Sequence, residues 1–113
     1  MAVDCIFCKI VAGEIPSSEV LADDEFIAIR DVNPLAETHV LVIPREHHAD
    51  LNAWVAAGES SDRLHAFATR TAAQLGVGTG FRLLTNIGAA AGQSVFHLHL
   101  HIIAGSSDPL IGL

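Results

Sequence analysis

The sequence predicts an α+β domain built on a five-stranded antiparallel sheet, with one long and one short helix packed on it. Segments with the composition of strands precede a long helical segment, and two more such segments follow it. Half of the 113 residues are apolar, which is enough for one hydrophobic core in a chain too short for two. No repeat or linker divides the chain, and we expect residues 1–113 to form a single domain.

The first half of the chain contains three predicted strands and the short helix. Residues 18–22 and 25–31 are apolar-rich segments separated by two aspartates, as in a β-hairpin. Residues 38–44, THVLVIP, form the third strand, which the proline at its end stops. We expect the short helix over residues 46–54, after this proline.

The second half predicts the long helix and two further strands. Residues 60–75 repeat apolar side chains at helical spacing, begin with serines that can cap a helix, and are followed by glycine. Residues 80–87 and 95–103 are the fourth and fifth strands. The segment between them, GAAAGQS, has the small residues of a loop.

Composition and charge restrict the partners of this protein. A net charge of −7 with six scattered basic residues argues against nucleic-acid polymers, whose binding depends on clustered lysine and arginine. The apolar runs are too short to cross a bilayer, and the first residues lack the basic start and apolar stretch of a signal peptide. We therefore expect a cytoplasmic protein that binds no membrane, while a small anionic ligand is compatible with this charge.

Three histidines, His97, His99 and His101, alternate with apolar residues in the fifth predicted strand. Alternation would place the histidines on one face and the apolar residues on the core face. A face that is merely solvated would more usually carry threonine, lysine or glutamate, which favours a functional role. The outer two histidines would lie about 13 Å apart, too far to share one metal ion, so their roles must differ. The apolar residues expected to face the core are Phe96, Leu98, Leu100 and Ile102.

The loop before this strand carries groups suited to an anion. Gly92 allows close approach of the backbone, and the side chains of Gln93 and Ser94, with exposed N–H groups, suit phosphate oxygens. Asn86 lies at the start of the same segment. A turn of small residues is usually only a turn, but one that leads directly to three histidines is a candidate phosphate site beside a nucleophile.

The motif HLHLHII resembles the His-φ-His-φ-His-φ-φ signature of the histidine triad (HIT) superfamily, in which φ is apolar. The segments CIFCKIVAGEIPSS, IRDVNPLAETHVLVIPREH and TNIGAAAGQSVFHLHLHII resemble its histidine-triad nucleotide-binding branch, over roughly residues 5–104. The resemblance implies a homodimeric α+β protein that hydrolyses purine nucleoside phosphoramidates such as adenosine 5′-phosphoramidate. The alternatives are a dinucleoside polyphosphate hydrolase, a nucleotidyl transferase, or a non-catalytic nucleotide-binding module.

The resemblance also implies the catalytic roles. His99 would attack the α-phosphorus and form a nucleotidyl-histidine that water then hydrolyses. Ser94 would hand a proton to the departing amine, because an amide anion is a very poor leaving group. His39 matches a further histidine that supports the triad.

Binding of the nucleotide is implied at three places. His101 and Gln93 would hold phosphate oxygens, helped by the backbone N–H of Gly92 and by Asn86. Asp31 would bind both ribose hydroxyls with one carboxylate. The apolar residues that would enclose the purine are Ile6, Phe7, Ile10, Ile29 and Val32.

Cys5 and Cys8 have the C-x-x-C spacing of zinc ligands, and such a site needs two more ligands. The resemblance implies that these are His47 and His97, with His48 as the neighbouring alternative to His47. We expect zinc as a structural cofactor that pins the N-terminal segment to the sheet, and no organic cofactor. Two buried free thiols are the alternative. The short tail AGSSDPLIGL has no aromatic residue, unlike many relatives in this branch, so the leaving-group preference is not predicted.

Overall fold

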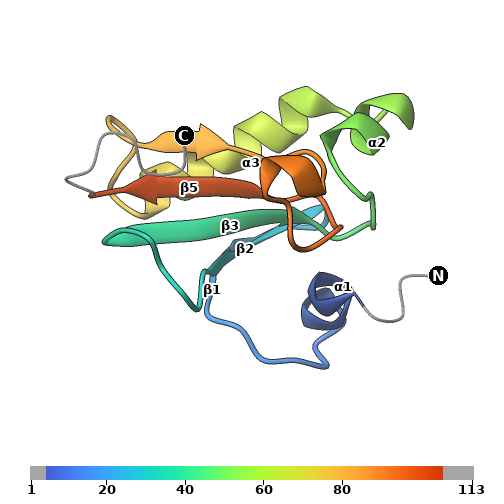
Figure 1. Ribbon diagram of the computed structural model, residues 1–113. Helices are drawn as coiled ribbons and strands as arrows, with labels where there is room; N and C mark the ends of the chain where they lie inside the picture. Colours follow the sequence, from blue (N-terminus) through green and yellow to red (C-terminus); the bar gives the residue numbers. More distant parts are fainter. Residues whose placement is uncertain (1–4, 106–113) are drawn as a thin grey trace.

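The computed structural model describes residues 5–105, which form a five-stranded antiparallel sheet flanked by helices (Figure 1). The order across the sheet is β1-β2-β3-β5-β4. This confirms the predicted α+β class and the number of strands. The strands are β1 (Glu19–Ala22), β2 (Phe26–Arg30), β3 (Thr38–Pro44), β4 (Arg82–Leu84) and β5 (Leu100–Ala104).

The described residues contain three α-helices, which cover both faces of the sheet. The helix α1 (Ile6–Val11) lies on one face, while α2 (Leu51–Ala56) and α3 (Ser61–Gln74) belong to the core of the other (Figure 1). The helix α1 was not predicted. Within residues 5–105, no helix is both long and apolar enough to span a membrane.

The sheet separates two apolar cores. The larger core packs α2 and α3 against the sheet around the aromatic side chains of Phe26, Trp54 and Phe67. Each large side chain buried in this way stabilises the fold by about 1.5–3 kcal/mol. The smaller core packs α1 against the other face, and its buried members are Phe7, Ile27, Ile29, Leu41 and Ile43.

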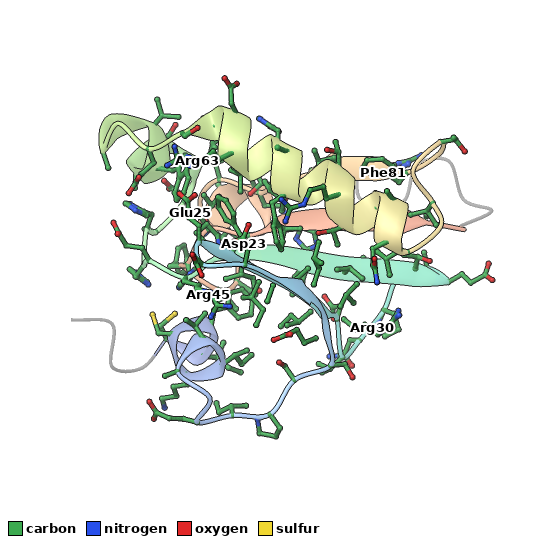
Figure 2. All side chains as sticks on the ribbon, turned by 180° about the vertical axis from the view of Figure 1, so that it is seen from behind. Asp23, Glu25, Arg30, Arg45, Arg63 and Phe81 are labelled. Carbon is green, nitrogen blue, oxygen red and sulfur yellow. The ribbon has the colours of Figure 1, made fainter. Side chains whose placement is uncertain are left out.

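The β1–β2 hairpin is held by its turn and by α3. The Asp23 carboxylate accepts hydrogen bonds from the backbone N–H groups of Glu25 and Phe26, both at 2.8 Å. Arg63 of α3 donates two hydrogen bonds to Glu25, at 2.7 and 3.1 Å (Figure 2). The hairpin is therefore oriented against the long helix, and the prediction of a turn at the aspartates is confirmed.

The helices α2 and α3 each begin directly after a residue whose side chain caps the N-terminus. The Ser60 hydroxyl accepts from the Arg63 N–H at 3.1 Å, so α3 begins where predicted. The prediction for α2 began too early, because the Asp50 carboxylate caps this helix by accepting from the Ala53 N–H at 2.9 Å. The preceding residues 45–50 form a loop rather than the first turn of the helix.

The fifth strand is shorter than predicted, since it begins at Leu100 rather than at residue 95. The Leu98 N–H donates to the His48 carbonyl at 2.7 Å instead of to a neighbouring strand. The expectation that Phe96 faces the core was wrong, because the chain bends there and leaves this side chain 51% exposed. Leu98, Leu100 and Ile102 are buried as expected. Most of the C-terminal tail, residues 106–113, lies outside the described residues.

Candidate functional site

Four potential metal ligands from three separate segments converge beside α1. Cys5 precedes the helix and Cys8 lies within it, while His47 follows β3 and His97 precedes β5. Their ligand atoms all lie within 4.8 Å of one another. The His97 Nδ1 lies 3.3 Å from the Cys5 Sγ, 3.5 Å from the Cys8 Sγ and 3.1 Å from the His47 Nδ1. The structure therefore brings together all four residues that the sequence predicted.

The geometry of this cluster fits a tetrahedral zinc ion. Tetrahedral bonds of about 2.3 Å to sulfur and about 2.0–2.1 Å to nitrogen place ligand atoms about 3.3–3.8 Å apart. The separations between His97 and the other three ligand atoms, and between Cys8 and His47, are 3.1–3.5 Å, close to these values. The Nε2 of His97 lies 2.7 Å from the Pro44 carbonyl oxygen, which only accepts, so the ring proton is on Nε2. The lone pair on Nδ1 is thus directed at the cysteines, as a metal ligand requires.

Burial has opposite consequences for a bound cation at two ionisable groups of the cluster, His97 and Cys8. Burial lowers the pKa of His97 to about 4, so that its ring is neutral at physiological pH. Burial, together with the neighbouring Cys5, raises the pKa of the Cys8 thiol to about 11. A bound divalent cation reverses this second effect, because it stabilises the thiolate.

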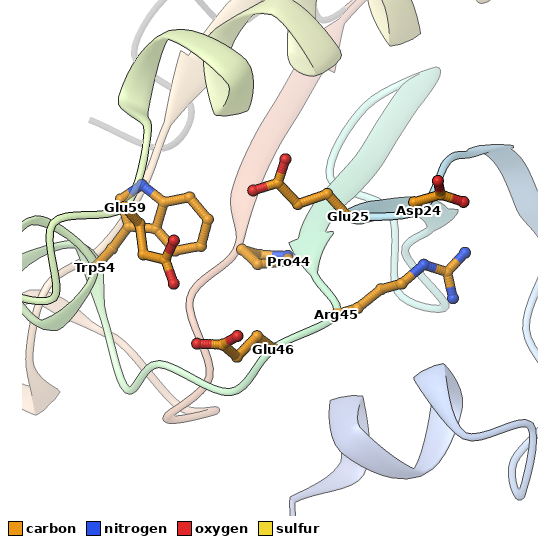
Figure 3. A pocket seen from close by; sticks show the side chains of 7 residues that line it. All are labelled: Asp24, Glu25, Pro44, Arg45, Glu46, Trp54 and Glu59. Atoms are coloured by element: carbon orange, nitrogen blue, oxygen red, sulfur yellow. The ribbon is translucent and has the colours of Figure 1, made fainter.

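His48 is directed away from this cluster. Its Nε2 lies 3.1 Å from a carboxylate oxygen of Glu46 and 3.1 Å from one of Glu59. Both glutamates line a separate, mainly acidic pocket of about 170 Å³ (Figure 3). Of the two adjacent histidines, His47 is therefore the one placed to bind a metal with the cysteines.

A pocket of about 300 Å³ opens on the face of the sheet that α1 covers. Its polar lining residues are His99, His101, Ser94, Asp31, Arg30 and Asn33. It adjoins a second hollow of about 380 Å³, which shares part of its apolar wall and extends along residues 15–18. The apolar wall consists of Ile6, Phe7, Ile10, Ile29, Val32, Leu41 and Val95.

The tautomer of His99 is set by the backbone. Its Nδ1 lies 2.8 Å from the His97 carbonyl oxygen, so Nδ1 carries the proton and Nε2 keeps a lone pair. Burial lowers the pKa of His99, which keeps the ring neutral. The edge of Phe7 packs against it with ring centres 5.0 Å apart. Such an imidazole can act as a nucleophile toward a group bound in the pocket.

His101 and His39 form a hydrogen-bonded pair. The Leu35 N–H donates to the His39 Nδ1 at 3.1 Å, so the His39 proton is on Nε2. That Nε2 lies 2.9 Å from the His101 Nδ1 and 3.5 Å from an oxygen of Asp31. Because the His39 Nε2–H donates to the His101 Nδ1, that nitrogen is unprotonated and the proton of the His101 ring is on its Nε2. Burial lowers the pKa of His39 and lowers that of His101 to about 4, so both rings are neutral.

Gln93 organises the loop before the histidines. Its amide donates to the carbonyls of Ala49 and Val95, at 2.7 and 3.0 Å, and accepts from the Gly88 N–H at 2.8 Å. Gly92 ends a short 3-10 turn (Ala89–Ala91) with a φ of +93°, which favours glycine. Gln93, Gly92 and Asn86 do not line the 300 Å³ pocket. Their role as phosphate ligands stays a prediction.

Thr85, which holds the backbone of the nucleophile candidate, was not expected from the sequence. The Thr85 hydroxyl donates a hydrogen bond of 2.7 Å to the His99 carbonyl, just beyond the ends of β4 and β5. This hydrogen bond holds the backbone of His99 in place through its carbonyl, whereas the bond from its ring goes to the His97 carbonyl. No local sequence signal marks such a contact, because the partner is a backbone atom fourteen residues away.

The fold and the histidine cluster define a protein of the histidine triad class. The chain belongs to the HIT domain family, whose model matches residues 12–108. It is 47% identical over 106 residues to an uncharacterised HIT-like protein of Synechocystis sp., covering 93% of each chain. Its structure is similar to that of a HIT family hydrolase from Clostridium thermocellum, with a TM-score of 0.82 and 40% identity, covering 98% of this chain and 99% of that one. It is also similar to a histidine triad nucleotide-binding protein from Candida albicans, with a TM-score of 0.74 and 32% identity, covering 87% and 72%.

Proposed function

We propose that this protein is a hydrolase of purine nucleoside 5′-phosphoramidates or related nucleotidyl compounds, acting through a covalent nucleotidyl-histidine. The observation that carries the proposal is the Nδ1–H bond of His99 to the His97 carbonyl, which leaves a neutral Nε2 in a pocket of nucleotide size. The resemblance to a HIT family hydrolase and to a nucleotide-binding protein of the same class supports it.

In the first step the His99 Nε2 forms a bond to the α-phosphorus while the bond from phosphorus to the amine breaks. The departing amine takes a proton from the Ser94 hydroxyl, which lines the same pocket. In the second step water attacks the phosphorus and returns a proton to Ser94 while the bond from phosphorus to the His99 Nε2 breaks, which releases the nucleoside monophosphate. The neutral Nε2–H of His101 can donate to a phosphate oxygen in both steps, because His39 occupies its Nδ1.

The remaining pocket residues would bind the nucleoside. The Asp31 carboxylate, half-buried at the pocket, would accept hydrogen bonds from the two ribose hydroxyls. The purine would lie against the apolar wall that α1 provides through Ile6 and Ile10. We further propose that Cys5, Cys8, His47 and His97 hold a structural zinc ion, and that the protein is a cytoplasmic homodimer.

The substrate class is tested by comparing two phosphorus compounds with the purified protein. Adenosine 5′-phosphoramidate should be hydrolysed to AMP and ammonia, and phosphorus NMR measures this reaction. Its kcat/KM should be much higher than that of a diadenosine polyphosphate. A preference for the polyphosphate would assign the alternative, a dinucleoside polyphosphate hydrolase. Binding of AMP without turnover of either compound would assign a non-catalytic nucleotide-binding module.

A further inference from the structure

The helix α1 is shared by the metal cluster and the nucleotide pocket. Cys5 and Cys8 belong to the cluster, and the Cys5 Sγ caps the helix by accepting from the Cys8 N–H at 3.3 Å. Ile6, Phe7 and Ile10, on the same helix, form one wall of the pocket. A helix of six residues is not stable by itself, so its order depends on such tertiary anchors.

His97 is a second shared element. Its Nδ1 faces the two thiols, whereas its backbone carbonyl accepts the proton of the His99 Nδ1. The ring of Phe7 packs edge-on against both histidines, with ring centres 5.9 Å from His97 and 5.0 Å from His99. Any shift of His97 in the cluster is therefore transmitted to the proposed nucleophile through the backbone and through Phe7.

The segment that supplies His47 forms a third connection. The adjacent His48 carbonyl accepts from the Leu98 N–H, and the next carbonyl, that of Ala49, accepts from the Gln93 amide, both at 2.7 Å. The loop before the histidine strand is thereby tied to the same segment as the metal ligand. Two segments of the cluster thus reach the pocket directly, and the third reaches it through this loop, in which the Gln93 amide also holds the carbonyl of Val95, a pocket residue.

We propose that metal occupancy of the cluster and nucleotide binding in the pocket are positively coupled. With the metal bound, α1 and His97 are already ordered, so the nucleotide does not have to order them at the expense of its own affinity. By linkage, the nucleotide must raise the affinity for the metal by the same factor. The inference rests on the proposed function, since the pocket is taken to bind a purine nucleotide.

The test measures both directions of the coupling. The Kd of AMP is measured by calorimetry on zinc-loaded and zinc-stripped protein, with circular dichroism to check that both are folded. The Kd of zinc is measured in chelator-buffered titrations with and without saturating AMP. We expect both constants to improve by the same factor, at least about fivefold, as is usual for coupled sites. Equal AMP affinity in both forms overturns the coupling, whereas no AMP binding in either form overturns the proposed function.

A variant keeps the test decisive if the stripped protein unfolds. Phe7→Leu retains an apolar side chain but removes the edge contacts with His97 and His99. We expect this variant to bind zinc, while AMP improves its zinc affinity by a smaller factor than in the unaltered protein. The same factor in both proteins would show that AMP acts only through global folding, and would overturn the local coupling.

Discussion

The Nδ1 of His99 lies 2.8 Å from the backbone carbonyl oxygen of His97, two residues before it. A carbonyl can only accept, so this contact places the proton on Nδ1 and leaves Nε2 unprotonated. The bond is made by the backbone, and no carboxylate is needed to select the tautomer. The same His97 presents its own Nδ1 to two cysteines. His97 thus orients the proposed nucleophile through its backbone carbonyl, and its ring is a member of the metal cluster.

The two adjacent histidines after β3 should differ in their effect on the metal. His47→Ala removes a ligand and should lower bound zinc, measured by elemental mass spectrometry, from near one ion per chain to a small fraction. His48→Ala is the matched control, because its ring contacts Glu46 and Glu59 instead of the thiols. Loss of zinc in the control but not in His47→Ala would show that the ligands are assigned incorrectly.

Asp31 should distinguish ribose from deoxyribose. Hydrogen bonds to a charged carboxylate contribute about 1.5–3 kcal/mol, so Asp31→Ala should weaken AMP binding by about tenfold or more. The variant should bind 2′-deoxy-AMP about as well as AMP, whereas the unaltered protein prefers AMP; calorimetry measures both. Asp24→Ala, an equal loss of charge at the exposed hairpin turn, should leave this preference intact. A ribose preference that survives in Asp31→Ala would contradict the role.

Stability should fall in mild acid because of the buried histidines, among them the pair His39 and His101 together with His97 and His99. The pKa of His101 is lowered to about 4, and that of His39 is lowered too, chiefly by burial. Between pH 6.5 and about 4 the unfolded chain therefore binds protons that the folded protein does not, which favours unfolding as the pH drops. Urea denaturation at pH 7.5 and 5 should show this loss.

His101→Asn provides the comparison for this acid effect. The variant lacks one of these buried rings, so its free energy of unfolding should change less between pH 7.5 and 5 than that of the unaltered protein. An identical change in the two proteins would show that other groups cause the acid sensitivity.

Local signals in the sequence explain which elements could be predicted. The helix over 60–75 was correct within one residue at each end, because a serine cap and a regular apolar spacing mark it. The sheet was predicted from strand composition, although β5 begins five residues later than expected. Phe96 fits the alternating pattern but not the fold, since pattern alone does not reveal where the chain bends.

Contacts with distant backbone atoms could not be predicted. The hydrogen bonds of the Gln93 side-chain amide to three backbone groups, one of them that of Ala49, were not expected, while its role at a phosphate stays a prediction. Thr85 was not expected at all, and its hydroxyl holds the His99 carbonyl. The choice between His47 and His48 also needed the structure, because both lie in the loop after β3, where only the folded chain shows that the ring of His47 meets the cluster and that of His48 meets two glutamates.

The central claim is that the Nε2 of His99 forms a temporary covalent bond to the phosphorus of the substrate. Mass spectrometry of protein quenched with denaturant at alkaline pH, where a phosphorus–histidine bond survives, during turnover of adenosine 5′-phosphoramidate tests it most directly, with His99→Ala and the exposed α3 variant His65→Ala as parallel samples. We expect an added adenylyl group on His99 in the unaltered protein and in His65→Ala, and none in His99→Ala, whose turnover should fall by several orders of magnitude. Near-normal turnover by His99→Ala, or an adenylyl group on another residue, would contradict the account.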